Sequence, residues 1–104
     1  MASDVKTITA ISLETLESLS DYDNWTAFLS SAAWQFKYPF ADQILIYAQR
    51  PHATACGTFE FWHENKNWYR WIRKGVEGIA LLRETDNGYK LKYVYDVSDT
   101  RSMD

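Results

Sequence analysis

Residues 68–82 read Trp-Tyr-Arg-Trp-Ile-Arg-Lys-Gly-Val-Glu-Gly-Ile-Ala-Leu-Leu, and this stretch decides the fold of the chain. Aromatic and basic residues are interleaved at its start, two glycines follow, and an apolar run ends it. The apolar run predicts a strand over residues 79–84, and the tripeptide Asp86-Asn87-Gly88 predicts a hairpin closed by a type I′ turn. The stretch therefore joins a basic-aromatic surface to a core strand.

The segment that returns from this turn has the alternation of a strand. One face of it carries Tyr89, Leu91, Tyr93, Tyr95 and Val97, and the other carries Lys90, Lys92, Val94 and Asp96. We expect residues 68–73 to add a third strand, joined to the hairpin by a glycine-containing turn over 74–78. Residues 98–104 are polar, and we expect them to form a tail.

Helical spacing dominates the residues before this sheet. The apolar positions Trp25, Phe28, Leu29, Ala32 and Phe36 predict an amphipathic helix that is capped by Asp23 or Asn24 and ends before Pro39. Residues 40–49 are apolar nearly all round, which predicts a central buried helix. Thr58 is expected to cap a short helix over the following residues. Residues 1–11 are expected to be a loose lead-in to a short helix that starts at Ser12.

The order of helices and then strands indicates an α+β fold. We expect three or four N-terminal helices packed on one face of a small antiparallel sheet of about three strands ending in a β-hairpin. The organisation would be a lead-in and short helix over residues 1–20, one domain over 21–98 and a tail over 99–104.

Composition limits the class of protein. The 104 residues, 46% of them apolar and 16% aromatic, suit one folded domain. The single cysteine, Cys56, excludes an internal disulfide and fits a reducing compartment. The sequence shows no signal peptide and no apolar run long enough for a bilayer, so we expect a cytoplasmic protein with no membrane partner.

The net charge of −3 conceals an uneven distribution. Residues 1–23 hold five acidic residues against Lys6 alone. Residues 65–95 hold seven basic residues against three acidic ones. Salt screens exposed charges beyond about 10 Å, so the local balance matters more than the sum for any partner.

Catalytic and metal-binding patterns are weak in this sequence. Cys56 with His52 or His63 could form a thiol–base pair, but a lone cysteine is more often a small buried residue. Glu60 and His63 have the Glu-x-x-His spacing of di-metal bundles without the further carboxylates that such sites use. We therefore expect no enzyme activity, no metal and no cofactor.

A nucleic-acid partner fits the pattern better. Single strands are bound by basic grooves with aromatic faces on which bases stack. Residues 68–74 supply this mixture, and a second basic-aromatic edge lies near the helices; the candidate contacts are Trp68, Arg70, Trp71, Arg73, Lys74, Lys37, Tyr38 and Arg50. In a strand, an inward Ile72 exposes Trp71, whereas a buried Trp71 weakens the stacking argument.

Residues 38–54, Trp62 and residues 71–80 together resemble the N-terminal domain of ArdC-like antirestriction proteins, over a match that runs from about residue 25 to 98. That domain also begins large helicase and methylase-like proteins of conjugative elements. The resemblance implies a non-catalytic module that binds single-stranded DNA with little sequence preference, fused to or acting with a helicase, methylase or metalloprotease-like domain.

Several positions match the pattern of this family, namely Gln43, Arg50, Trp71, Arg73, Lys74 and Gly75, which adds Gln43 to the candidate DNA contacts. Three positions depart from it, with Pro39 where a serine is frequent, Asp42 where an asparagine is frequent and Val76 where a basic residue is usual. The charge of Asp42 would repel phosphate. A second hypothesis therefore stays open, in which the chain is a protein-interaction module that docks on a host defence enzyme or on a catalytic domain.

Overall fold

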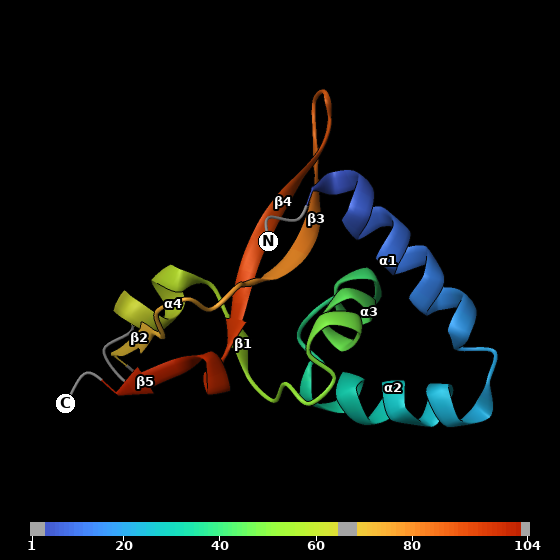
Figure 1. Ribbon diagram of the computed structural model, residues 1–104, viewed down its shortest axis with the longest axis horizontal. Coiled ribbons are helices and arrows are strands. Elements are labelled where there is room, and N and C mark those ends of the chain that lie inside the picture. The colour runs from blue at the N-terminus through green and yellow to red at the C-terminus, as the bar shows by residue number, and fades with distance from the viewer. Residues whose placement is uncertain (1–3, 65–68, 103–104) are drawn as a thin grey trace.

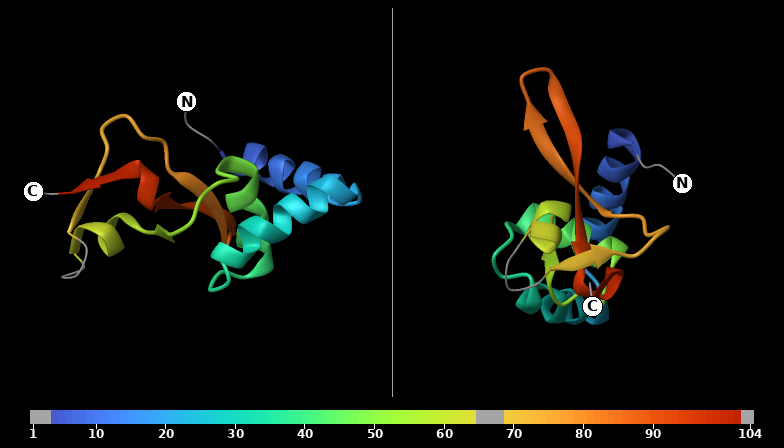
Figure 2. Two further views of the ribbon diagram at one scale, coloured as in Figure 1. Left: turned by 90° about the horizontal axis from the view of Figure 1, so that it is seen from below. Right: turned by 90° about the vertical axis from the view of Figure 1, so that its left-hand side faces the viewer.

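The computed structural model describes residues 4–64 and 69–102, and the α+β class is confirmed. In these residues three helices lie to one side of a long β-hairpin, and a fourth, short helix lies with a second small sheet on the other side (Figure 1). The strand β4 runs between the two parts (Figures 1 and 2). No helix in this described part is long and apolar enough to cross a membrane.

The hairpin consists of β3 (Ile79–Thr85) and β4 (Gly88–Asp96), as the sequence predicts. Their register runs from Ile79 opposite Val94 to Thr85 opposite Gly88. The type I′ turn is wrong, because Tyr69 is the only described non-glycine residue with a positive φ. The positive φ falls on Gly88 instead, at 132°, so glycine's freedom is used just after the two-residue loop.

The third strand of the sheet is not the predicted one. It is β1 (Cys56–Gly57), which pairs antiparallel with the end of β4, giving the order β1-β4-β3. The basic-aromatic strand β2 (Arg70–Ile72) pairs with β5 (Thr100–Ser102) in a separate two-stranded sheet. The outer edge of β3 is bound at Ala80 by the Gln49 side chain. Residues 70–72 pair instead with the C-terminal segment, so the predicted polar tail over 98–104 is wrong for residues 98–102.

Helix α1 (Val5–Ser18) starts well before the position expected from the sequence. Residues 5–11 are helical rather than a loose lead-in, and Asp4, not Ser12, caps the helix by accepting from Thr7 N at 2.7 Å. Valine, threonine and isoleucine at its start are poor helix formers. The helix is stabilised by tertiary packing against α3, β3 and β4, where Ile8 is fully buried.

Helix α2 (Tyr22–Trp34) is capped by Asp21, earlier than the predicted Asp23 or Asn24. Helix α3 (Phe40–Gln49) matches its prediction, with Ile44, Leu45 and Ile46 all buried. The short α4 (Phe59–Glu64) is capped as expected, since the hydroxyl of Thr58 accepts from Phe61 N at 3.1 Å. The core thus forms where α1 and α3 cover the base of the hairpin.

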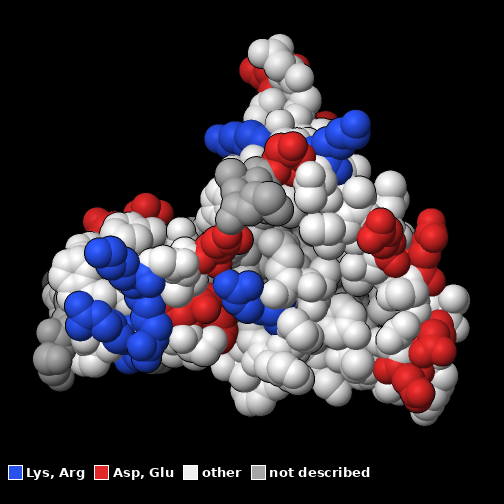
Figure 3. Space-filling view, in the orientation of Figure 1, with Lys and Arg blue, Asp and Glu red and all other residues white. Residues whose placement is uncertain are grey.

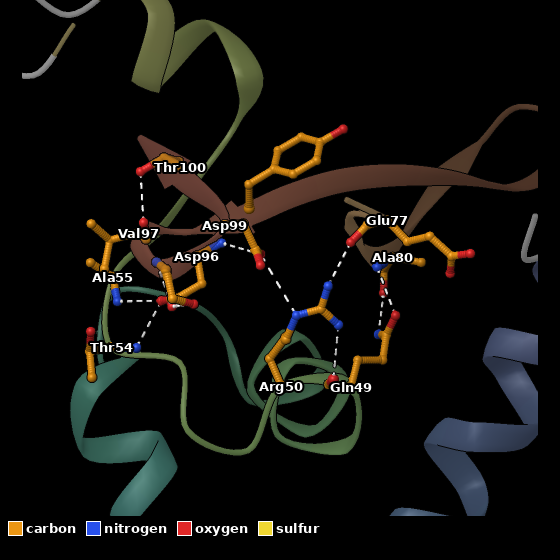
Figure 4. A network of polar contacts seen from close by, with 12 residues as sticks. Gln49, Arg50, Thr54, Ala55, Glu77, Ala80, Asp96, Val97, Asp99 and Thr100 are labelled. Atoms are coloured by element: carbon orange, nitrogen blue, oxygen red, sulfur yellow. Dashed lines mark hydrogen bonds and ion pairs between the residues drawn. The ribbon is translucent and has the colours of Figure 1, made fainter. Parts of the chain in front are cut away.

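One glutamine connects this helical layer to the sheet. The side-chain amide of Gln49 donates to the Ala80 carbonyl and accepts from the Ala80 N–H, both at 2.9 Å (Figure 4). It satisfies the backbone of an edge strand in the way a neighbouring strand would. Ala80 is fully buried, so these two backbone groups have no access to water.

A single carboxylate organises the end of β4. One oxygen of Asp96 accepts from the backbone N–H of Thr54 and Ala55, at 2.9 and 3.0 Å. The other accepts from the backbone and hydroxyl of Ser98, at 3.0 and 2.6 Å. Asp99 completes a capping box by accepting from Asp96 N at 3.1 Å. The box starts the short 3-10 helix η1 (Val97–Asp99), which leads into β5.

We expect Asp96→Ala to lower the free energy of unfolding by about 2–4 kcal/mol, because it leaves the N–H groups of Thr54 and Ala55 without their acceptor. Urea denaturation followed by tryptophan fluorescence measures the change. Asp96→Asn keeps one oxygen acceptor and is the matched control, with a smaller loss. Equal losses in the two variants would contradict this role of the carboxylate.

The stability should also depend on pH through this residue. Burial raises the pKa of Asp96, but the hydrogen bonds from Ser98, Ala55 and Thr54 outweigh it and hold the pKa below its ordinary value of 3.8. The stabilisation is therefore complete above that value and is lost as the pH falls through the lowered pKa. Urea midpoints measured across this range should fall more steeply for the natural chain than for Asp96→Asn.

Replacement of Gln49 tests the link between α3 and β3. Gln49→Leu keeps the size of the side chain but leaves both Ala80 groups unpaired, and we expect a loss of about 1–3 kcal/mol in unfolding free energy. Hydrogen exchange at the Ala80 amide should become faster relative to the Leu81 amide, which faces β4 in the same strand. Unchanged exchange at Ala80 would show that the side chain does not protect this edge.

Candidate nucleic-acid interface

The basic-aromatic residues lie on the small part of the molecule formed by α4, β2 and β5, which we call the basic lobe. It lies at the opposite end from α1 and α2 (Figure 1). Lys and Arg side chains gather over β2 and β5 at this end, whereas acidic side chains gather over α1 and α2 (Figure 3). The uneven charge of the sequence is therefore also uneven in space.

The direction of Trp71, on which the stacking argument depends, is outward. Its side chain is 39% exposed, while Ile72 is partly buried. Trp71 lies directly opposite Arg101 in the β2–β5 ladder, and opposed residues of an antiparallel pair project from the same face. A tryptophan and an arginine from two strands thus lie side by side at the surface.

Two residues of α4 extend this aromatic surface. The rings of Phe59 and His63 are stacked, with centroids 5.2 Å apart and planes at 18°. The His63 ring contacts Trp71, with centroids 4.5 Å apart. We call Phe59, His63 and Trp71 the aromatic row. Phe59 is 43% exposed, so both ends of the row reach solvent.

The sequence did not identify Phe59, His63 or Arg101 as site residues. Phe59 and His63 are four residues apart on a helix, and this spacing places them on one face, which is the signal that could have found them. No local signal marks Arg101, because its position follows only from the pairing of β5 with β2.

Two of the predicted arginines are held in place by β5. Arg70 donates from Nε to the Thr100 hydroxyl at 2.6 Å, and Arg73 donates from Nε to the Thr100 carbonyl at 3.2 Å. A hydrogen bond at Nε restrains each side chain and does not involve the terminal nitrogens Nη1 and Nη2. By alternation Arg73 is on the Trp71 side of the strand and Arg70 on the other.

The turn after β2 presents a further cation. Lys74 is exposed and is followed by Gly75, whose φ of 84° lies in the left-handed region that glycine adopts without strain. Tyr69, at the other end of β2, is 49% exposed and has a φ of 43°. Trp68, the remaining candidate in this segment, lies outside the described residues.

The predicted contacts near the helices have structural partners. Tyr38 donates its hydroxyl to the Cys56 carbonyl at 3.0 Å, and burial, with smaller effects of Cys56 and Asp42, raises its pKa to about 12. Gln43 donates to the Gln35 carbonyl at 2.9 Å. These bonds hold α3 against its neighbours. Tyr38 and Gln43 are therefore positioned as parts of the fold.

Lys37 differs from them, because its side chain is exposed. Its ammonium group lies over the rings of Tyr38 and Phe61, 5.6 and 5.3 Å from their centroids. Phe61 belongs to α4, so Lys37 reaches the edge of the basic lobe from the helical part. Among the predicted helical-edge residues, it is the exposed one whose side chain contacts α4.

Arg50 is the centre of a structural network (Figure 4). It donates from Nη2 to the Glu77 carbonyl at 2.7 Å and from Nη1 to the Gln49 carbonyl at 3.1 Å, and its Nε lies 3.7 Å from Asp99 Oδ2. It thereby ties the end of α3 to the loop before β3 and to η1. These contacts use three of its nitrogen atoms within the protein.

We do not expect Asp42 to repel phosphate, because its carboxylate is buried and paired. Asp42 is only 3% exposed and accepts two hydrogen bonds from Arg83, at 2.9 and 3.0 Å. A paired carboxylate under the surface has little field outside the protein. The negative charge of Asp42 is therefore neutralised by Arg83 of β3.

Cys56 does not have the environment of a thiol nucleophile. Cys56 is fully buried, and burial together with the nearby Asp96 and Asp99 raises its pKa to about 12. A thiol with this pKa is not a nucleophile at neutral pH. Among the described residues, no three His, Cys, Asp or Glu side chains are grouped in a way that could hold a metal ion.

The reactivity of Cys56 can be measured directly. We expect the native chain to react at least about 100-fold more slowly with a thiol reagent at pH 7 than the same chain unfolded in guanidinium, because the thiol is both buried and protonated. Free cysteine in the same buffer serves as the reference. Rapid modification of the folded protein would show that Cys56 is accessible.

Comparison of the chain with protein-family models, with curated proteins and with solved structures finds no match. The resemblance to the ArdC-like N-terminal domain therefore remains a proposal that rests on the residues quoted for it.

Proposed function

We propose that the chain binds single-stranded DNA, with little sequence preference, through the basic lobe. The observation that carries the proposal is the exposed aromatic row beside three cationic side chains, Arg73, Lys74 and Arg101. Bases stack on aromatic faces while cations bind the phosphates, and neither contact depends on base identity.

Stacking favours a single strand over a duplex. The faces of paired bases are covered by their neighbours in a duplex, whereas those of a single strand are free to stack on protein rings. Trp71 and Phe59 are both partly exposed at the two ends of the row. Their rings give two platforms on one rigid support, because α4 packs against β2.

Most of the acidic residues lie away from the proposed contacts; the exposed Glu60 and Glu64 of α4 are the exceptions within the lobe. The three buried carboxylates in the described residues are Asp42, Asp96 and Asp99, and all have protein partners. Many of the exposed acids lie on or beside α1 and α2, at the other end of the molecule (Figure 3); these are Glu14, Glu17, Asp21 and Asp23. Physiological salt screens exposed charges beyond about 8 Å, so these acids have little effect at the basic lobe.

The backbone of Tyr69 supports a binding role for the start of β2. A bulky residue at a φ of 43° costs on the order of 1–3 kcal/mol. The ring that this backbone carries is 49% exposed, so the strain is not offset by burial of the ring in the core. Strained residues of this kind cluster at ligand-binding sites.

The resemblance to ArdC-like proteins supplies the wider setting of the proposal. In that setting the chain is the DNA-binding module of a plasmid or conjugative element and acts with a fused or separate catalytic domain. A role in antirestriction belongs to the same proposal. The basic lobe would hold the single strand, and the chemistry would belong to the other domain.

The first test measures binding of a labelled oligonucleotide by fluorescence anisotropy. Trp71→Ala should weaken binding by about 1–3 kcal/mol, or roughly 5- to 150-fold, because one stacked base loses its platform. Tyr89→Ala is the control, since Tyr89 is an aromatic residue that is 60% exposed near the tip of the β3–β4 hairpin, away from the lobe (Figure 1). Equal losses in the two variants would contradict the proposed site.

Salt dependence tests the cationic part of the site. With about three phosphates contacted, the logarithm of the binding constant should fall against the logarithm of the salt concentration with a slope near −2. The double variant Arg73→Ala/Lys74→Ala should bring this slope close to −0.7. Lys6→Ala removes a positive charge from α1 instead, and this control should leave the slope unchanged.

Absence of binding even at low salt would overturn the proposal and favour the docking hypothesis. In that case a pull-down from host lysate that survives nuclease treatment would identify a protein partner. A preference for duplex over single-stranded DNA would contradict the stacking of bases on the aromatic row, but not the binding of phosphates by the cations.

A further inference from the structure

The apolar stripe that predicts a core face on α2 is largely on the surface. Phe28 is buried, but Trp25 is 40% and Leu29 45% exposed. Phe36, just after the helix, is 82% exposed, and Tyr22 at its start is 76% exposed. The buried side of α2 instead carries Phe28 together with Ser31 and Gln35. The helix therefore has a second apolar face that no described element covers.

The size of this face suits a protein interface. Aromatic side chains bury about 150–250 Å² each, so the exposed fractions of Tyr22, Trp25, Leu29, Phe36 and Phe40 amount to roughly 500 Å² of apolar surface. Patches of this size lie at the upper end of those found on monomers and are often functional. With a polar rim, the face approaches the roughly 800 Å² per partner of a stable complex.

The order of residues along α2 is self-complementary about Leu29. The large Trp25 is four residues before it and the small Ala33 four residues after it. Antiparallel packing of two copies therefore places each tryptophan against an alanine of the other copy. Such alternation of large and small side chains lets two helix faces fit closely.

The charges at the start of α2 favour the same arrangement. Asp21 and Asp23 are both exposed at the N-terminal end of this helix. Antiparallel pairing keeps the acidic ends of the two copies apart, whereas parallel pairing would bring them together. The helix dipoles also oppose each other favourably in the antiparallel arrangement.

We propose that α2 binds a second copy of this chain, antiparallel, across a two-fold axis that passes near Leu29. The interface is isologous, so it closes on itself as a dimer and leaves no free copy of the surface. Each copy contributes Trp25, Leu29 and Phe36 to the buried centre, with Asp21 at the rim. This inference does not depend on the binding of DNA by the basic lobe.

Sedimentation velocity of the full chain is the first test. The mass should rise to twice 12.2 kDa as the concentration increases from micromolar to sub-millimolar. Leu29→Lys should weaken association about 100-fold or more, because it puts two like charges at the buried centre of the interface. The control Leu13→Lys replaces a leucine that is 57% exposed on α1, and should leave the dimer unchanged.

A cross-link locates the axis. Leu29→Cys should form a disulfide-linked dimer on mild oxidation, since a residue beside the axis lies next to its own copy. The natural Cys56 is fully buried and does not compete. Leu13→Cys should cross-link far more slowly. Circular dichroism of each variant checks that the helices remain folded.

Three results would overturn the proposal. The first is a monomer at all concentrations, which would assign this face to a different partner. The second is a dimer that is unaffected by Leu29→Lys, which would place the interface elsewhere. The third is growth beyond a dimer, which an isologous contact does not allow.

Discussion

The carboxylate of Asp96 is the interaction on which the two halves of this molecule depend. It binds the N–H groups of Thr54 and Ala55 just before β1, and it starts η1 just after β4. The first pair of bonds sets β1 beside β4, and the second turns the chain toward β5. Because β2 pairs only with β5 in the described part of the chain, the position of Trp71 follows from this carboxylate.

Arg50 connects this region to the helical layer. Its contact with Asp99 and its bond to the Glu77 carbonyl join η1, the loop before β3 and the end of α3. Gln49, the preceding residue, binds the edge of β3. Two successive side chains at one helix end thus fix the helices against the sheet on one side and the basic lobe on the other. These contacts give Arg50 a structural role that does not depend on DNA.

The molecule separates its surfaces by chemistry. The basic lobe displays cations over β2 and β5 and the aromatic row, with Glu60 and Glu64 on α4, while α1 and α2 display acids and the outward apolar stripe of α2 (Figure 3). Asp96 and Asp99, which lead into β5, are buried and paired, which removes their field from the surface of the lobe. A protein of net charge −3 can in this way offer a locally positive face. The proposed DNA site and the proposed dimer interface use different ends, so neither needs the other.

The sequence by itself determined the features that neighbouring residues encode. The bounds of α3, the cap of α4 at Thr58 and the pairing of β3 with β4 across a short turn all follow from periodicity and turn residues within a few positions. For the same reason, the basic and aromatic character of residues 70–74 is plain from their order in the chain. Half of the candidate site was therefore visible in one segment.

Only the tertiary structure decided the rest, because those features depend on residues far apart in the chain. Helix α1 has weak local signals and is held by burial of Ile8 in the core. The apolar stripe of α2 has the same period whether it faces the core or solvent. Periodicity therefore could not predict that Phe28 is buried while Trp25 and Leu29 are exposed. Trp71 and Arg101 lie far apart in the sequence, and their meeting on one face was settled by the pairing of β2 with β5, which no local pattern specifies.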